Sequence, residues 1–112
     1  MLGSNPIAYA VPAGEQLVIL DIATSMVAGG KAFSASALGE SIPEGWIVDE
    51  QGRPATDPST FPAKSTLTLM AAHKGYGLAL IAKILSGVLP GAAVAGSVLS
   101  YAYNDPSKPT NH

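Results

Sequence analysis

The chain contains no cysteine, which excludes disulfide scaffolds, thiolate metal centres and enzymes with a cysteine nucleophile. A cysteine-free chain suits the cytoplasm, where we expect this protein. Histidine is almost as scarce, since His73 and His112 are the only two in 112 residues. A histidine-based metal centre needs more ligands than these, so we expect no metal site.

Charge is also sparse: 12% of the residues are charged, 47% are hydrophobic, and the formal net charge is −2. So small a charge argues against a nucleic-acid partner and against electrostatic docking on an anionic membrane. The length suits one domain with one core, but a free monomer usually has a more charged surface. We therefore expect a homo-oligomer or a segment of a larger protein.

Signals for membrane targeting are weak as well. Residues 1–15 lack the basic region and the unbroken apolar run of a signal peptide. Residues 84–103 carry no charge and are long enough to span a bilayer, but Pro90 and Gly91 interrupt them. We expect two buried helical segments joined at residues 89–91, and no contact with a membrane.

The first part of the chain predicts two strands and a helix. Residues 7–11 form an apolar run that ends at a proline-glycine turn, and residues 17–23 begin with four branched apolar residues. That second run predicts a strand buried on both faces. A helix is expected at residues 26–38, with Thr24 or Ser25 as its N-cap. Two glycines inside this helix indicate close approach of a ligand or of another part of the backbone.

The remainder predicts a loop, a strand and a helix. Residues 39–64 contain four prolines and a tight turn at residues 49–52, so we expect a long loop there. A short strand is expected at residues 66–70, and a helix at residues 76–89. This helix is apolar nearly all round, which predicts a central position. Residues 104–112 have no apolar anchor and are expected to be a mobile tail.

Standard catalytic and nucleotide motifs are absent. The sequence has no Gly-x-Ser-x-Gly elbow, no Walker loop and no Gly-x-Gly-x-x-Gly after a strand. Attention therefore falls on the junction "LDIATS", where Asp21 follows a strand and precedes the expected helix. The start of a helix offers free N–H groups to phosphate or ribose, and Asp21 can accept hydrogen bonds from a sugar hydroxyl. The alternative is that Asp21 and Thr24 only cap the helix.

The second junction is "AAHKGYGL". Lys74 can supply a point charge to a phosphate or carboxylate, and Gly75 allows close backbone approach. His73 can donate to an anion or to a substrate oxygen, and Lys31 can reach a bound anion. The alternatives are a structural histidine and lysines that are simply solvated.

Taken together, these segments resemble a known family. "GSNPIAYAVP", "LVILDIATS", "AGGK", "IPEGWIVDEQGRPATDP" and "HKGYGLALI" occur in an order and spacing similar to the malate/L-lactate dehydrogenase family of NAD(P)-dependent oxidoreductases. This non-Rossmann family also includes ureidoglycolate and sulfolactate dehydrogenases. Its members are about three times longer, so the resemblance implies an internal segment of the cofactor domain. Residues 1–103 would form part of that domain.

The resemblance implies an α+β fold, with helices around a mostly antiparallel sheet, and a homodimer with active sites near the subunit interface. The cofactor would be NAD or NADP and the substrate a small 2-hydroxy or 2-keto acid. The family's cofactor contacts fall here on Asp21, Ile22, Ala23 and Lys74. Positions near the substrate, by the same resemblance, are Ser4, Asn5, Lys31 and His73.

Two departures from the family pattern matter. Ala71 and Ala72 stand where the family usually has a glycine pair, which restricts the backbone beside Lys74. The family's catalytic histidine lies upstream in a Ser-His-Gly context that this sequence lacks, and Arg53 is a poor clamp for a carboxylate because it lies in a turn. We therefore expect no catalysis from this chain alone. The alternative is a non-catalytic α+β module that self-associates through exposed apolar helices.

Overall fold

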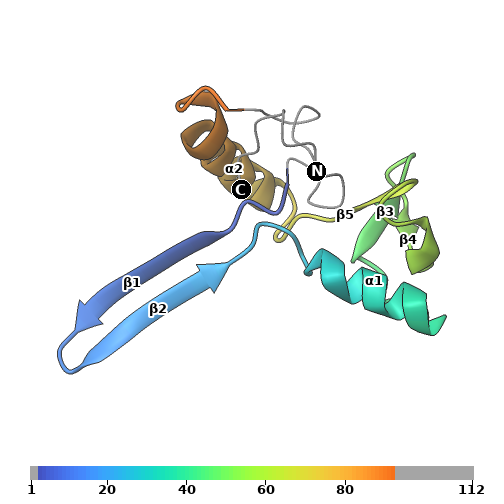
Figure 1. Cartoon of the computed structure of the whole chain (residues 1–112), viewed down its shortest axis with the longest axis horizontal. Coiled ribbons are helices and arrows are strands. Elements are labelled where there is room, and N and C mark those ends of the chain that lie inside the picture. Colours follow the sequence, from blue (N-terminus) through green and yellow to red (C-terminus); the bar gives the residue numbers. More distant parts are fainter. Residues whose placement is uncertain (1–2, 93–112) are drawn as a thin grey trace.

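The computed structural model describes residues 3–92, and its elements are short apart from one hairpin and two helices (Figure 1). Both sheets in this part of the chain are antiparallel, one of two strands in the order β1-β2 and one of three in the order β4-β3-β5. The expected α+β class is confirmed. The elements follow one another as β1 (Ile7–Ala13), β2 (Gln16–Ile22), α1 (Gly29–Leu38), β3 (Ile47–Asp49), β4 (Pro54–Ala55), the 3₁₀ helix η1 (Pro58–Thr60), β5 (Ser65–Leu67), α2 (His73–Lys83) and the π-helical segment η2 (Ile84–Val88).

Strands β1 and β2 form a long hairpin that projects away from the rest of the described chain (Figure 1). The two strands were predicted, and the turn between them begins at Gly14, whose φ of 67° suits a two-residue hairpin turn. Their predicted burial was wrong, because the side chains of residues 17–20 are 45–68% exposed. Within residues 3–92 no third strand pairs with this hairpin, so its apolar faces remain open.

The core lies at the other end of the molecule, between α1 and the three-stranded sheet. Ile47 of β3 is fully buried, and Val27, Ile42 and Leu67 pack around it. Residues 39–64, predicted to be a loop, therefore contain two strands and a 3₁₀ helix. These strands are only two or three residues long, too short for an alternating pattern to be read from the sequence.

The turn predicted at residues 49–52 is confirmed and reverses the chain between β3 and β4. The carboxylate of Asp49 accepts hydrogen bonds from the backbone N–H groups of Gln51 and Arg53, both at 2.9 Å. The guanidinium of Arg53 also pairs with it at 2.8 Å. The backbone hydrogen bond from Arg53 is the largest of the effects that lower the pKa of Asp49.

Helix α1 begins three residues later than predicted, and neither Thr24 nor Ser25 caps it. Its N-cap is Ala28, which provides no side-chain hydrogen bond. The reason is that residues 24–26 form an extended segment hydrogen-bonded to residues 68–70. A Cβ at Gly29 would meet the ring of Phe61 at 3.4 Å and the side chain of Leu67 at 3.7 Å, and one at Gly30 would meet nothing within 4 Å. Among residues 3–92 no other backbone therefore approaches these glycines closely, and approach of a ligand stays a prediction.

Helix α2 begins at His73, three residues earlier than predicted, and is not central within the described residues. Leu78 and Ile81 are 45% and 56% exposed, and Gly75 and Ala79 are among its few buried residues. Residues 3–92 hold no helix whose length and hydropathy would carry it across a bilayer. The predicted second helical segment lies mostly outside the described residues, and the predicted tail at 104–112 lies entirely outside them.

We expect Ile47→Ala to lower the free energy of unfolding by about 2–5 kcal/mol, because it leaves a cavity in the middle of the core. Leu38 is a matched control, since its side chain is 72% exposed. Leu38→Ala should change stability by less than about 0.5 kcal/mol. Urea denaturation followed by circular dichroism measures both, and equal losses in the two variants would contradict this position of the core.

Candidate functional site

Thr24 joins the three segments that hold most of the residues predicted to bind cofactor or substrate. Its side chain is completely buried. Its backbone N–H and its Oγ1 both donate to the carbonyl oxygen of Ser4, at 2.8 and 2.9 Å. Its own carbonyl accepts from the N–H of Met70 at 3.0 Å. The segment before β1, the end of β2 and the segment leading into α2 therefore meet at Thr24.

The predicted cofactor residues 21–23 lie where β2 ends. Asp21 is opposite Ala8 in the hairpin and exposed, and Ile22 is opposite Ile7 and half-buried. Ala23 follows directly and is half-buried as well. Because α1 begins only at Gly29, the amides of residues 21–23 are not at a helix start. The interpretation of "LDIATS" as a helix opening was wrong, and so was the alternative of a capping role.

Residues 24–26 run antiparallel to residues 68–70. Ser25 is opposite Leu69 in an isolated bridge. Its Oγ is buried and has no hydrogen-bond partner. The adjacent hydroxyls of Thr24 and Ser25 therefore differ sharply, because one is hydrogen-bonded across the junction and the other is buried without a partner.

The start of α2 is strained. Ala71 and Ala72 have positive φ angles of 49° and 50°, a region that favours glycine. Ala72 is also the N-cap residue, with ψ of −119° and no side-chain hydrogen bond. Immediately afterwards, a Cβ at Gly75 would lie 1.8 Å from the carbonyl oxygen of Met70, so only glycine fits there. The two alanines that stand where the family usually has a glycine pair therefore have strained backbone conformations.

His73 and Lys74 form the first turn of α2, not the approach to it, and both side chains are exposed. The first turn contains no acidic residue. Ser4 belongs to the same junction through its bonds with Thr24, and Asn5 follows it with a φ of 37°. The structure therefore brings together the segments of Ser4, of residues 21–23 and of residues 73–74.

Lys31 is not part of this junction. It lies in the first turn of α1 with an exposed side chain, and its N–H bonds to the carbonyl of Ala28 at 3.0 Å. That helix packs beside η1, where the rings of Phe33 and Phe61 lie 5.1 Å apart between centroids.

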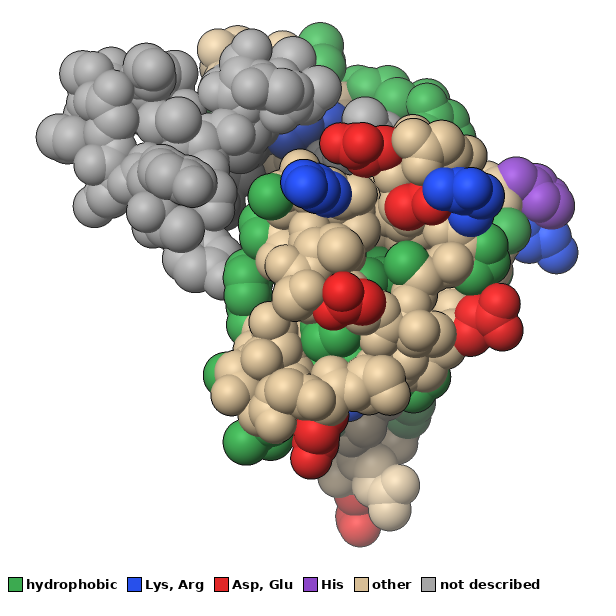
Figure 2. All heavy atoms as spheres, turned by 90° about the vertical axis from the view of Figure 1, so that its right-hand side faces the viewer, with side chains coloured by type: hydrophobic (Ala, Val, Ile, Leu, Met, Phe, Trp, Pro, Cys, Tyr) green, Lys and Arg blue, Asp and Glu red, His purple; other side chains and the backbone are tan. Residues whose placement is uncertain are grey.

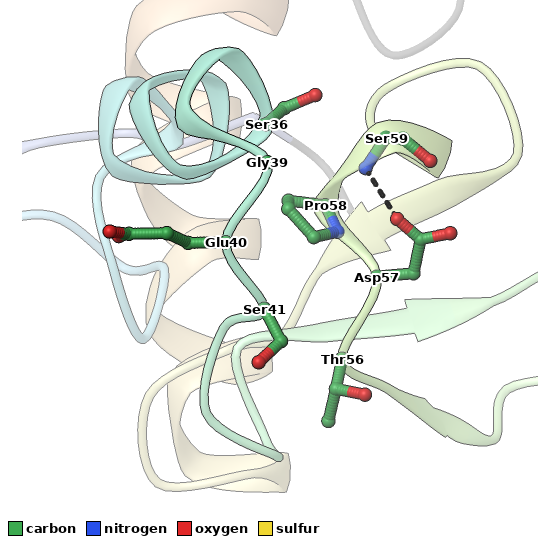
Figure 3. Close-up of a pocket in the computed structure, with 8 residues that line it drawn as sticks. All are labelled: Ser36, Gly39, Glu40, Ser41, Thr56, Asp57, Pro58 and Ser59. Carbon is green, nitrogen blue, oxygen red and sulfur yellow. Dashed lines mark hydrogen bonds between the residues drawn. The ribbon is translucent and has the colours of Figure 1, made fainter.

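An open cavity of about 280 Å³ lies elsewhere, between the end of α1 and residues 56–59 (Figure 3). None of the predicted site residues lines it. Hydrogen bonding by the side chain and backbone of Ser59 lowers the pKa of Asp57 there. Figure 3 shows the side chains of Glu40 and Asp57 pointing away from each other, so their carboxylates do not converge on one ligand.

Charge and metal ligands do not favour another site in the described part of the chain. Residues 3–92 contain no group of three histidine, aspartate or glutamate side chains able to hold a metal ion. On the face shown in Figure 2, acidic and basic side chains are scattered and form no patch of a single sign. The junction at Thr24 is therefore the candidate site.

The roles of Thr24 and Met70 in this junction were not predicted from the sequence, because each residue bonds to a partner that is distant in the sequence. The signal that was available is Gly75, which follows a histidine and a lysine and was expected to allow close backbone approach. The close approach found there is by the carbonyl of Met70, and approach of an anion to Gly75 stays a prediction.

The two adjacent hydroxyls provide a test of the junction. Thr24→Val removes a hydrogen-bonded hydroxyl at constant shape and should lower the free energy of unfolding by about 1 kcal/mol. Ser25→Ala removes a buried hydroxyl that has no partner, so its effect should lie between no change and a gain of about 1 kcal/mol. Chemical denaturation of both variants measures the difference, and a larger loss in Ser25→Ala would contradict the assignment.

The strain at Ala72 gives a second test. Ala72→Gly relieves an unfavourable backbone conformation and should stabilise the chain by about 1 kcal/mol, after the entropy that glycine adds to the unfolded state. The same substitution at the buried helical residue Ala79 should instead destabilise it by about 1 kcal/mol or more. Thermal or urea unfolding compares the two; destabilisation by Ala72→Gly would show that position 72 is not strained.

The chain is similar to known proteins over most of its length. The sequence profile of the family described as malate/L-lactate dehydrogenase matches residues 1–112. The chain is 41% identical over 104 residues to ureidoglycolate dehydrogenase (NAD(+)) of Escherichia coli, with 92% of this chain and 29% of that protein covered. It is 43% identical over 93 residues to (2R)-3-sulfolactate dehydrogenase (NADP(+)) of Chromohalobacter salexigens, with 82% and 28% covered.

A solved structure is similar as well. A dehydrogenase from Sinorhizobium meliloti superposes with a TM-score of 0.82 at 36% identity, and the match covers 98% of this chain and 32% of that one. The chain thus spans less than a third of the length of these relatives. It belongs to the malate/L-lactate dehydrogenase family.

Proposed function

We propose that this chain is a segment of the cofactor domain of an NAD(P)-dependent oxidoreductase. The complete enzyme would transfer a hydride between nicotinamide and a small 2-hydroxy or 2-keto acid. Family membership supports the reaction. Two relatives are named ureidoglycolate dehydrogenase (NAD(+)) and (2R)-3-sulfolactate dehydrogenase (NADP(+)), and these names support the substrate class. One of these names gives NAD(+) and the other NADP(+), so we propose that the cofactor is NAD or NADP.

The observation that carries this proposal is the set of hydrogen bonds at Thr24. They join the end of β2, where Asp21, Ile22 and Ala23 lie, to the segment that leads into α2. Lys74 lies in the first turn of that helix. A dinucleotide has ribose hydroxyls that a carboxylate can bind and phosphates that an ammonium group can bind. Neighbouring segments that offer both groups suit one such ligand.

The start of α2 fits an anionic group on local grounds too. No side chain caps this helix, its first turn has no acidic residue, and Lys74 is exposed. The positive end of the helix dipole adds to the charge of Lys74. We propose that Lys74 binds a cofactor phosphate, that Asp21 accepts from a ribose hydroxyl, and that Ile22 and Ala23 line the same site.

Ser4, Asn5, Lys31 and His73 are proposed to lie near the substrate in the complete enzyme. Ser4 and His73 belong to segments that meet at Thr24, which supports them more than Lys31 on α1. The bound nicotinamide would supply or accept the hydride. A group that protonates the developing alkoxide is still required, and the described residues offer no such histidine beside a carboxylate-binding arginine, because Arg53 pairs with Asp49.

We therefore propose that the isolated chain is inactive and binds cofactor weakly, since a site missing most of its walls cannot bury a dinucleotide. For the complete enzyme we propose a cytoplasmic homodimer with active sites near the subunit interface. Few charged residues and an exposed apolar hairpin support association.

Titration of the labelled chain with NADH and with NADPH, followed by amide chemical shifts, tests the cofactor site. We expect shifts at residues 21–23 and 73–74, with a dissociation constant of about 1 mM or weaker. Lys74→Ala should weaken binding at least about tenfold, because it removes the phosphate-binding charge. Lys64→Ala removes an exposed lysine outside the predicted site and serves as the matched control.

Shifts confined to other residues, or equal losses in the two lysine variants, would contradict the assignment of Lys74. Oxidation of NADH by the isolated chain in the presence of pyruvate or oxaloacetate would contradict the proposed inactivity. The absorbance of NADH at steady state measures this directly.

A further inference from the structure

Ser25 is a buried residue whose polar groups have no hydrogen-bond partner in the described part of the chain. The residue is 6% exposed. Its Oγ is unpartnered, and among residues 3–92 neither its backbone N–H nor its carbonyl oxygen makes a hydrogen bond. Nearly all buried N–H and C=O groups of folded proteins are paired. Three unused groups on one buried residue therefore indicate a partner from outside residues 3–92.

The bridge between Ser25 and Leu69 determines where these backbone groups point. The hydrogen bonds on either side of this pair join its neighbours in the two segments, at 2.9 and 3.0 Å. Ser25 and Leu69 themselves are therefore a pair that exchanges no hydrogen bonds in the antiparallel arrangement. The N–H and the C=O of Ser25 consequently point away from residues 68–70, side by side on the opposite edge of their segment.

That edge adjoins the segment that we propose to hold the cofactor. Ser25 follows Ala23 by two residues, and two residues of extended chain span about 7 Å. The residue between them, Thr24, connects the same segment to Ser4 and to the residues that lead into α2. A ligand bound along residues 21–23 would therefore have the unused groups of Ser25 as its neighbours.

The chemistry of these groups narrows the ligand. A backbone N–H and C=O side by side offer one donor and one acceptor, without charge. A primary carboxamide matches them, because its oxygen accepts a hydrogen bond and its NH2 group donates one. A phosphate or a carboxylate does not match, since it can only accept and would meet the carbonyl oxygen of Ser25 without a hydrogen between them. In a nicotinamide dinucleotide, the carboxamide on the nicotinamide ring has the matching groups.

We propose that Ser25 binds the carboxamide of the nicotinamide ring. Its N–H would donate to the carboxamide oxygen, and its C=O would accept from the NH2 group. This inference rests on the proposed function and adds a residue to the cofactor site. The carboxamide is attached to the ring carbon next to C4, which carries the hydride. Two hydrogen bonds to a buried backbone would therefore hold one face of C4 toward the substrate.

The experiment compares three ligands that share the riboses and the diphosphate. The first is NAD(+), or NADP(+) where that binds more tightly. The second is its analogue with a carboxylate in place of the carboxamide, and the third is ADP-ribose, which lacks the nicotinamide ring. Each is titrated into the labelled 112-residue chain, and the chemical shifts of the Ser25 amide and carbonyl are followed. The amide of Thr24 is the internal control, because it already donates to Ser4 at 2.8 Å.

We expect all three ligands to shift residues 73–74, and only the intact dinucleotide to shift the amide and carbonyl of Ser25. The signal of Thr24 should move much less. The carboxylate analogue should bind at least about tenfold more weakly than the intact dinucleotide, because it loses one hydrogen bond and places a charge beside a carbonyl oxygen.

Two kinds of failure can be told apart. Shifts at residues 73–74 with an unchanged Ser25 would overturn this inference and leave the cofactor site standing. Equal shifts of Ser25 with the carboxylate analogue, or with ADP-ribose, would do the same, the latter by assigning this edge to adenine or ribose. An intact dinucleotide that shifts neither residues 21–23 nor residues 73–74 would overturn the proposed function and this inference together.

Discussion

The hydrogen bonds of Thr24 determine how the candidate site is assembled. One buried side chain and its backbone connect Ser4, 20 residues earlier in the chain, with Met70. Together with the hydrogen bond from the N–H of Met26 to the carbonyl of Thr68, they hold the base of the hairpin against the segment entering α2. The hydrogen bonds of this one threonine therefore determine which distant residues become neighbours.

The same interaction explains the strain beside it. Because the N–H of Met70 is bound to Thr24, the extended segment at residues 68–70 ends at a fixed point, and α2 begins only three residues later. The chain changes direction at Ala71 and Ala72, and both residues have positive φ angles there. Such backbone persists only where its surroundings over-determine it, and here the contact of Gly75 with the carbonyl of Met70 closes the turn from the other side.

The sequence predicted the features that depend on local pattern. Both hairpin strands and the turn at Asp49 could be read from apolar runs and turn residues, whereas the α+β class was implied by the family resemblance. The start of α1 could not, since the pairing of residues 24–26 with residues 68–70 overrides the capping preference of Thr24. Burial of β2 was also wrong: a run of branched residues indicates a strand that needs cover, but it does not show whether the same chain supplies that cover.

The central claim is that the end of β2 and the start of α2 lie side by side. The chain has no cysteine, so a spin label on His73→Cys reports from a single exposed position. Paramagnetic broadening of the backbone amides measures proximity to that label. The account predicts strong broadening at residues 21–24 and at Ser4, and much weaker broadening at Gly14 in the hairpin turn. Sharp amide signals at residues 21–24 in the labelled chain would contradict it.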